Sequence, residues 1–384
     1  MVIPQYPPPV IGGMERQCHE LARALASSGL KVTVISGRTL PDQPASSVEA
    51  GVQVLRVPFP RRRWLRFPVT TVGLIRTLIG QRNEFDVVHV HTMSWFGSMA
   101  TLLGKLLGKP VLAKLPTGLE WAFGRRSLRF AIFRRCDAIA LLSPDTVEQF
   151  RTLGYPDARI FKITNGVSLE SFGRAEPPAE SAPDTPLRVI FVGRLDPEKG
   201  LLDILATWSD VVAGCERPVR LVICGEGPFE AELRRAIIER GVEDSVELRG
   251  HVPNVQHELA AADVFVLPSF IEGNSNAILE AMAASLPIVS TAVGGTPLLV
   301  GPEGADWLIA VHDQARLRAL LLRLLNQSDT RRQLGDAMAR RVREHMAIES
   351  VAERYRAAYA RLAAGERDLV GAESSGAFDG IMHA

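Results

Sequence analysis

Two carboxylates, Glu272 and Glu280, stand on either side of the small polar run Gly273-Asn274-Ser275-Asn276. The run is typical of the start of a helix, where free backbone amides and the helix dipole favour an anion. On one continuous helix the two acids would lie about 12 Å apart, which is wider than the roughly 5 to 9.5 Å of a glycosidase acid pair. We therefore expect each acid to accept hydrogen bonds from a different set of hydroxyl groups. The alternatives are an exposed loop acid at 272 and a helix-surface acid at 280.

Two cations follow a predicted strand in the stretch VGRLDPEKG (192–200). Arg194 and Lys199 on a strand-to-helix loop suit a diphosphate, because they can neutralise the charge that grows on a departing leaving group. An exposed turn with solvated charges is the alternative. After the next strand, Gly225 and Gly227 in CGEGP would let a ligand approach the backbone closely, although a plain turn explains such a pair more simply.

The stretch DVVHVH (86–91) ends a predicted strand with His89 and His91 on one face of the sheet. A metal site would require a third ligand, and none is evident in the sequence. We interpret His89 as a structural histidine on these grounds.

The strands and helices around these candidate residues must position them. Along the chain, apolar runs alternate with helical patterns, which favours an α/β fold with parallel sheets. The first helix is expected over 13–29 and the last helical segment over about 313–364. The predicted strands are 31–36, 52–57, 86–91, 110–115, 138–143, 160–165, 187–193, 219–225, 245–250, 264–269 and 287–293. The pattern predicts two doubly wound, Rossmann-like domains that face a deep cleft, where open α/β folds bind ligands. The expected boundaries are 1–172, a linker over 173–186, 187–345, a helix over 346–364 that returns to the N-terminal domain, and a flexible tail over 365–384.

Composition points to a globular protein of 384 residues, 46% of them hydrophobic. No apolar run approaches the roughly 20 residues of a bilayer span, and the start of the chain does not read as a signal peptide. The four cysteines are scattered without a C-x-x-C pair, so a reducing cytoplasm is expected. Net charge is +1 overall, but residues 1–165 carry 22 Lys and Arg against 11 Asp and Glu. This basic half is expected to meet something anionic.

Two arginine clusters, Arg61–Arg66 and Arg125–Arg135, mix cations with large apolar residues. The second cluster is compatible with a helix that lies on an anionic membrane surface, which would place the protein at the inner face of the cell membrane. Arginines that snorkel from a core helix are the alternative. Nucleic acid is less favoured as a partner, because no recognition motif accompanies the clusters.

As an ordered set, the motifs resemble those of the retaining family 4, or group 1, glycosyltransferases. In that family two glutamates with seven residues between them flank a glycine and small polar residues, as in EGNSNAILEAMA (272–283). The accompanying motifs follow in the family's order: GGMERQCHELARALASSG (12–29), TNGVSLESF (164–172), VGRLDPEKG, CGEGP, RGHV (249–252) and AADVFVLPS (261–269). The resemblance covers about residues 9–360.

The resemblance implies a GT-B fold, with the acceptor held by the N-terminal domain and the nucleotide sugar by the C-terminal one. It implies that Arg194 and Lys199 hold the donor diphosphate, Glu280 the ribose and Glu272 the sugar. The remaining implied contacts are phosphate and sugar contacts from Gly12, Gly13, Gly225, Gly273, Asn274, Ser275 and Asn276, and His91 against the reacting carbon. Such enzymes need no divalent metal, and this chain has no D-x-D sequence to bridge one to a diphosphate.

Three departures accompany the resemblance. AKLPTG (113–118) replaces a His-Gly acceptor loop, which leaves Lys114, Thr117 and Gly118 as the candidate acceptor contacts. Leu298 stands where relatives often have an acid. The strand that should precede Gly12 must come from MVIPQYPPPVI, so that strand is short or the start of the chain is incomplete.

The function predicted from the sequence is retaining transfer of a hexosyl unit from a UDP- or GDP-linked sugar to a glycan or lipid-linked acceptor, in bacterial polysaccharide or glycolipid biosynthesis. The alternatives are a nucleotide-sugar epimerase of the same fold and a catalytically silent binding protein. A nicotinamide dehydrogenase is disfavoured, because no G-x-G-x-x-G opens a helix after a strand.

Overall fold

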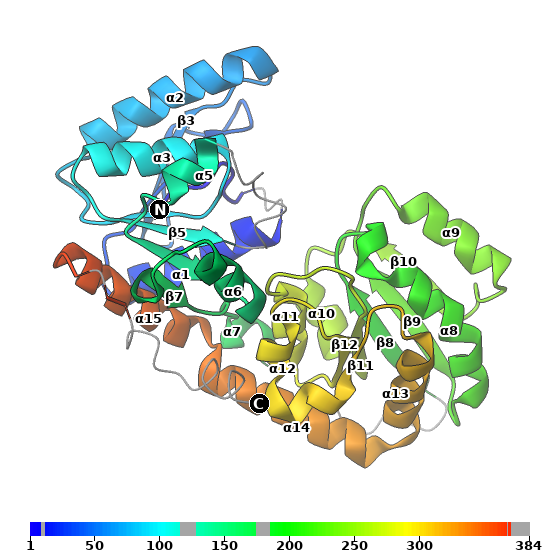
Figure 1. The fold of residues 1–384 in the computed structure, drawn as a ribbon. Helices are drawn as coiled ribbons and strands as arrows, with labels where there is room; N and C mark the ends of the chain where they lie inside the picture. Colours follow the sequence, from blue (N-terminus) through cyan, green and yellow to red (C-terminus); the bar gives the residue numbers. More distant parts are fainter. Residues whose placement is uncertain (9–11, 116–127, 174–184, 367, 370–384) are drawn as a thin grey trace. The chain divides into compact units, whose positions relative to one another are not determined.

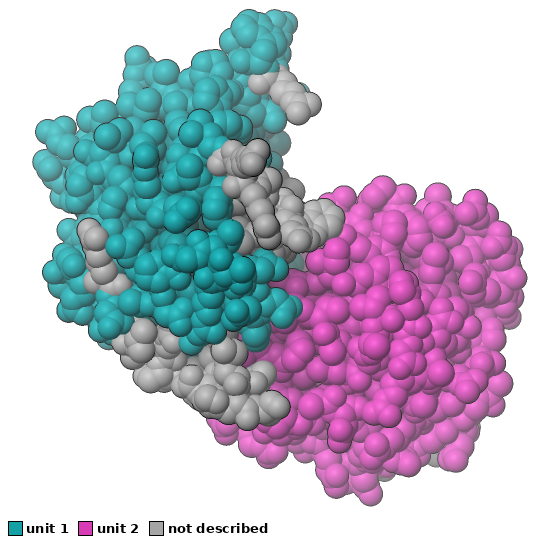
Figure 2. Space-filling view, in the orientation of Figure 1, with its two compact units in different colours: residues 1–166, 348–378 teal, residues 167–347, 379–384 magenta. Residues whose placement is uncertain are grey.

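The computed structural model describes residues 1–8, 12–115, 128–173, 185–366 and 368–369. The chain forms two compact units, coloured separately in Figure 2. Unit 1 contains Met1–Gly166 and the described residues from Ile348 onward, and unit 2 contains Val167–Ala347. Most of the predicted linker, 174–184, lies outside the described residues.

The strands of unit 1 form two sheets, in the orders β1-β3-β2 and β4-β5-β6-β7. All neighbours are parallel except β2 and β3. The strands are β1 (Thr33–Arg38), β2 (Ser46–Glu49), β3 (Val52–Pro58), β4 (Val88–Val90), β5 (Val111–Leu115), β6 (Ala138–Leu141) and β7 (Ile160–Lys162).

The first residues of the chain join these two sheets. Val2 forms parallel bridges with Ile35 of β1 and with Val90 of β4. Its N–H donates to the carbonyl of His89 at 2.8 Å, and the N–H of His91 donates to the carbonyl of Val2 at 3.0 Å. The strand expected before the glycine loop is therefore present as a short central segment. Counted first, it gives the order β3-β1-segment-β4, in which the chain turns back at the centre of the sheet.

Helices cover both faces of the unit 1 sheet (Figure 1). On one face, α1 (Gly13–Ser27) packs against α15 (Ile348–Ala363), and on the other, α2 (Arg63–Gly80) packs against α3 (Trp95–Leu106), which contacts α5 (Leu128–Phe133). The strands supply alternate residues to the two cores: Val34 and Leu112 face α1 and α15, while Ile35 and Val111 face α2 and α3. The remaining elements are α6 (Pro144–Thr152) and η1 (Asp157–Arg159).

Unit 2 contains one six-stranded sheet in the order β10-β9-β8-β11-β12-β13, parallel throughout. The strands are β8 (Leu187–Val192), β9 (Val219–Cys224), β10 (Val246–Gly250), β11 (Val264–Leu267), β12 (Ile288–Thr291) and β13 (Leu308–Ile309). In chain order this is 3-2-1-4-5-6, the order of the doubly wound nucleotide-binding fold. The direction of winding reverses between β8 and β11, so the loops after these two strands lie side by side.

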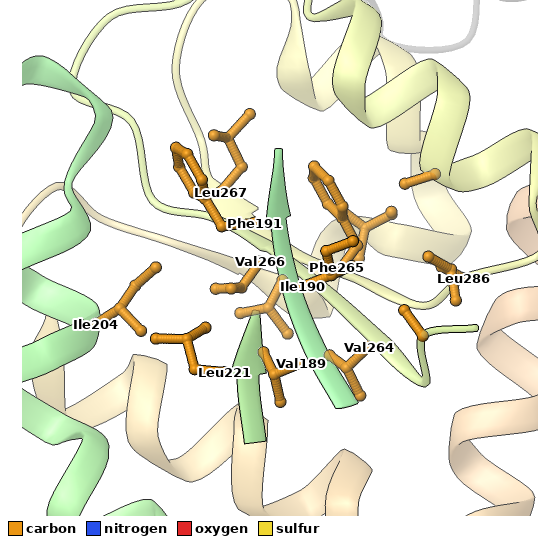
Figure 3. Packing of buried hydrophobic residues seen from close by; sticks show 14 of the residues in the cluster. Val189, Ile190, Phe191, Ile204, Leu221, Val264, Phe265, Val266, Leu267 and Leu286 are labelled. Carbon is orange, nitrogen blue, oxygen red and sulfur yellow. The ribbon is translucent and has the colours of Figure 1, made fainter. Parts of the chain in front are cut away.

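The other elements of unit 2 alternate with its strands. The helices are α7 (Leu169–Phe172), α8 (Leu201–Gly214), α9 (Glu230–Glu239), α10 (Val255–Ala260), α11 (Asn276–Ala283), α12 (Thr296–Gly304), α13 (Gln314–Asn326) and α14 (Ser328–His345), with short 3-10 turns η2 (Pro197–Lys199) and η3 (Ala305–Trp307). Figure 3 shows the core at the centre of the sheet, where Val189, Ile190 and Phe191 of β8 lie beside Val264 and Phe265 of β11. These strands read as continuous apolar runs because helices cover both of their faces.

One expected domain boundary differs in the structure. The first segment of unit 1 ends at Gly166 rather than at 172, because α7 packs against α10 and α11 of unit 2. Of the expected flexible tail, only residues 365, 366, 368 and 369 are described. Leu369 among them is fully buried, and its N–H donates to the carbonyl of Ala158 at 2.8 Å.

Candidate active site

The clearest constellation in unit 2 lies at the reversal point between β8 and β11. Lys199 ends η2 in the loop after β8, and Glu272 lies in the loop between β11 and α11. The Lys199 Nζ atom is 2.6 Å from Glu272 Oε1, which also accepts a hydrogen bond from Ser269 Oγ at 2.9 Å. Residues far apart in the chain thus meet because their strands are neighbours in the sheet.

The Lys199–Glu272 pair is largely shielded from water. The side chains are 20% and 10% exposed, and Ser269 is fully buried. A charged pair in such surroundings interacts more strongly than one on the surface, since water screens it less. Glu272 therefore orients the ammonium of Lys199 towards a fixed position. An anionic ligand at this loop would compete with Glu272 for that ammonium.

Arg194 lies in the same loop but in different surroundings. Its side chain is 69% exposed, and its Nε atom pairs with Asp196 Oδ2 at 2.9 Å. The structure thus places the two predicted diphosphate ligands on one loop, with Lys199 held and Arg194 at the surface. An exposed arginine can reorient towards a ligand at little cost, because surface ion pairs contribute weakly.

The polar run that precedes α11 forms a capped helix start. Ser275 is the N-cap, and its Oγ accepts a hydrogen bond from the N–H of Ile278 at 3.4 Å. The helix therefore starts within the polar run, as predicted from the sequence. Gly273, Asn274 and Ser275 are buried, and Asn276 is the first helical residue. Glu280 lies further along α11 and is only 4% exposed, so it is not the helix-surface acid considered as an alternative.

Two glycines are required where the site loops touch. Gly225 has φ +151° and a Cβ there would lie 1.8 Å from the carbonyl oxygen of Gly193; Gly294 has φ +56° and a Cβ would lie 1.7 Å from that of Glu272. No side chain fits at either position. Gly225 is therefore required for the packing of these loops, independently of any contact with a ligand. The contact of Gly294 with the Glu272 backbone and the hydrogen bond from Ser269 were not predicted from the sequence, although the Gly294-Gly295 pair in VGGTPLLV (293–300) is a visible signal of close backbone contact.

In unit 1, His91 follows β4 beside the central Val2 segment, the equivalent reversal point of that sheet. The rings of His89 and His91 lie 3.9 Å apart, which confirms that they share a face. His89 Nδ1 is 2.6 Å from Tyr359 Oη on α15, as expected of a structural histidine. Both ring nitrogens of His91 are buried and find no hydrogen-bond partner among the described residues. Buried polar atoms without partners are uncommon and mark positions where a ligand or water is accommodated.

Lys114, the described member of the candidate acceptor group, is also buried. Its Nζ donates to Asn165 Oδ1 at 2.8 Å, and burial lowers the pKa of its ammonium to about 8. Thr117 and Gly118 lie outside the described residues. Gly12 is the N-cap of α1 and Gly13 its first residue. Leu298, which stands where the resemblance implies an acid, is fully buried in α12.

Because several of its histidines are buried, the protein is expected to lose stability steeply as the pH falls. Burial holds the pKa of His89 and of His91 well below its usual range, and it also lowers the pKa of His19. Below about pH 6.5 the unfolded chain binds protons that the folded chain does not, so stability falls as pH decreases, by up to about 1.4 kcal/mol per pH unit for each histidine. Urea unfolding at pH 7.5, 6.5 and 5.5 measures this loss. A His89→Gln/His91→Gln variant should have a shallower pH slope, and an unchanged slope would contradict the assignment.

Among the residues that the structure describes, no group of three or more His, Cys, Asp or Glu side chains could hold a metal ion. None of the described helices combines the length and apolarity needed to traverse a bilayer.

Each of the two units contains a region that matches a known family model. Residues 186–327 match the family model described as glycosyl transferases group 1, and residues 12–166 match the glycosyl transferase 4-like domain. The two matched regions lie in different units of the structure and together account for most of the chain.

Individual proteins agree with these family matches. A putative colanic acid biosynthesis glycosyltransferase of Escherichia coli K12 is 36% identical over 52% of this chain and 50% of that protein, so the match spans about half its length. A GDP-mannose-dependent phosphatidylinositol monomannoside mannosyltransferase of Corynebacterium glutamicum is 27% identical over 90% of this chain and 94% of that protein. The structure of Anabaena HepE with UDP-glucose shares the fold, with a TM-score of 0.73 and 17% identity over 94% of this chain and 98% of that one.

Proposed function

The chain belongs to the group 1 glycosyltransferases of GT-B fold, and from this premise we propose that it transfers a hexosyl unit from a UDP- or GDP-linked sugar to a glycan or lipid-linked acceptor. The observation that carries the proposal is the Lys199–Glu272–Ser269 constellation at the reversal point of unit 2. It offers a fixed cation for a diphosphate and a carboxylate for sugar hydroxyls. The relatives named for colanic acid and phosphatidylinositol mannoside synthesis support a role in bacterial polysaccharide or glycolipid biosynthesis.

We assign the departing diphosphate to Lys199, Arg194 and the amides before α11. Binding of the diphosphate would draw Lys199 away from Glu272, which leaves the Glu272 carboxylate available for hydroxyls of the sugar. Positive groups held in place before the reaction stabilise the charge that develops on the leaving oxygen. The buried Glu280 is assigned to the ribose. In this mechanism the acceptor attacks from the face that the diphosphate leaves, so the anomeric configuration is retained without a protein nucleophile or a divalent metal.

His91 is assigned to unit 1's part in the reaction. Its depressed pKa keeps the imidazole neutral at pH 7, and neither nitrogen is engaged by a described residue. A neutral imidazole can accept a hydrogen bond from one hydroxyl and donate to another. We assign Lys114, a buried cation of the same unit, to the acceptor together with Thr117 and Gly118.

The test is a panel of UDP- and GDP-hexoses incubated with the purified chain and candidate acceptors. Release of the nucleoside diphosphate and the mass of the product are recorded, and the anomeric configuration is read by NMR. We expect one donor to be consumed with retention. Conversion of the donor sugar without an acceptor would indicate an epimerase instead. Donor binding without turnover under any acceptor would indicate a binding protein.

A further inference from the structure

His312, in the loop between β13 and α13, has an unusual backbone conformation. Its φ angle is +65°, in the left-handed region that favours glycine and that a histidine adopts only at a cost in free energy. The side chain is 63% exposed, so burial of the imidazole does not offset that cost. A strained residue persists where its contacts hold it in place, and such residues gather at functional sites.

The first contact of His312 is with a buried carboxylate. The imidazole Nδ1 lies 3.0 Å from Asp203 Oδ2, and Gln314 Nε2 donates to Asp203 Oδ1 at 2.8 Å. A carboxylate accepts hydrogen bonds and does not donate them, so Nδ1 carries the hydrogen in this pair. Asp203 is 7% exposed and lies in the first turn of α8, against which α13 packs (Figure 1). His312 therefore fixes the start of the helix that follows the Lys199 loop.

The second contact is with the loop that carries Glu272. The ring centroids of His312 and Phe270 lie 4.3 Å apart, and Phe270 is two residues before Glu272. The N–H of Phe270 donates to the carbonyl of Glu198 at 2.7 Å, and Glu198 directly precedes Lys199. One side chain thus touches both segments whose charged residues form the Lys199–Glu272 pair.

The connection from Asp203 back to Lys199 is short and sterically fixed. Gly200 joins η2 to α8, and a Cβ added there would lie 2.0 Å from the carbonyl oxygen of Pro268. The N–H of Asp203 donates to the carbonyl of Gly200 at 3.0 Å. Because this junction has no free space towards the loop after β11, a displacement of Asp203 is transmitted to Lys199.

We propose that His312 is a positioning residue for sugar transfer, which holds the Lys199 and Glu272 loops in register for the donor diphosphate. This role rests on the proposed function, and it involves no contact between His312 and the substrate. Glycine would adopt the same backbone conformation without strain, but it would supply neither the ring contact nor the hydrogen bond to Asp203. The strained histidine is thus explained by what its side chain holds together.

The experiment compares His312→Gly and His312→Asn with the parent chain by urea unfolding, by calorimetric binding of UDP and GDP, and by kcat and KM for the preferred donor. His312→Gly relieves the backbone and removes both contacts, so we expect kcat to fall about tenfold with an unchanged urea midpoint. KM should change less than threefold, because the loss concerns the developing charge on the leaving group. His312→Asn tolerates the left-handed conformation, and its amide can donate to Asp203, so it should recover most of the rate.

A second background separates positioning from a general structural role. Because His312 acts through Lys199, His312→Gly should lower the rate of the Lys199→Ala chain less than twofold. The matched control is Ala50→Gly, which relieves another left-handed residue, at φ +49°, in the exposed turn between β2 and β3. That variant should keep the kcat and the urea midpoint of the parent.

The possible results distinguish this role from the proposed function. A parent-like kcat in His312→Gly would overturn the positioning role and leave sugar transfer intact. A tenfold fall that persists in the Lys199→Ala background would also overturn it, because His312 would then act independently of Lys199. A parent chain that neither binds UDP or GDP nor releases a nucleoside diphosphate would overturn the proposed function and the positioning role together.

Discussion

Lys199→Ala is expected to lower the rate of nucleoside diphosphate release about 100- to 1,000-fold. Glu272 holds the ammonium of Lys199 at 2.6 Å, and only 20% of the lysine side chain is exposed. Neither water nor a neighbouring cation can therefore take the position of the ammonium unless the loop rearranges. Loss of the ammonium removes a fixed positive group from the developing leaving-group charge. Single-turnover release of the diphosphate from the preferred donor measures the effect.

Three comparisons sharpen this prediction. Lys199→Arg keeps the charge but changes its geometry, so it should recover part of the rate. Arg235→Ala, which removes a cation that is 67% exposed on α9, should leave the rate unchanged. Because Lys199 and Glu272 act as a unit, Lys199→Ala/Glu272→Ala should cost much less than the product of the two single effects. A Lys199→Ala rate close to the parent would disprove the site assignment.

Gly294→Ala is expected to lower the free energy of unfolding by about 2 to 5 kcal/mol. The left-handed conformation alone costs a non-glycine residue about 1 to 2 kcal/mol, and overpacking adds about 1 to 3 kcal/mol. The added methyl group would lie 1.7 Å from the carbonyl oxygen of Glu272, and the N–H of Gly295 donates to Gly273 at 2.7 Å. The loop that carries Glu272 must move to relieve this clash. Urea unfolding followed by circular dichroism gives the stability change.

Gly241→Ala separates the two costs, since Gly241 has φ +61° but nothing within 4 Å of an added Cβ. The free energy of unfolding of the Gly241→Ala variant should fall only by the cost of the left-handed conformation, about 1 to 2 kcal/mol. The variant should keep the turnover of the parent chain. Gly294→Ala should also lose activity in the fraction that remains folded, because Glu272 is displaced. Equal destabilisation by the two substitutions would mean that the loop yields to the methyl group at no cost.

Much of the fold follows from local pattern. The buried strands of unit 2 were predicted to within a few residues, because helices cover both faces and leave uninterrupted apolar runs such as LRVIFV in β8. The short β2 was missed because it pairs antiparallel at the edge of the sheet and carries the exposed, polar sequence SSVE. Residues 308–309 of β13 are too few to form a pattern.

The candidate site was predictable as residue types and loops, but not as contacts. Lys199 and Glu272 are 73 residues apart, and they meet only because β8 and β11 are neighbours in the sheet. Strand order is a property of the whole unit, which no local window of sequence reports. The hydrogen bond from Ser269 depends on the same loop geometry.

Helix α2 illustrates a related limit. The arginine clusters suggested an anionic surface from sequence, yet periodicity alone does not identify which side of α2 faces the core. Trp64 and Leu74 are equally apolar, and only the packed structure separates a side chain that is 71% exposed from one that is fully buried. The same limit applies to His91, whose unengaged nitrogens become evident only when its neighbours are placed.

The return of α15 to unit 1 has a consequence for biosynthesis. Tyr355 and Leu362 of this helix are buried in the core that α1 shares with the sheet, and Tyr359 meets His89. Unit 2 is a continuous stretch of chain, Val167–Ala347, whereas unit 1 is built from segments on both sides of that stretch. On the ribosome the first segment of unit 1 therefore cannot complete its core until α15 has been made, after all of unit 2. It must remain incompletely packed until then, which exposes it to chaperones longer than its position in the chain suggests.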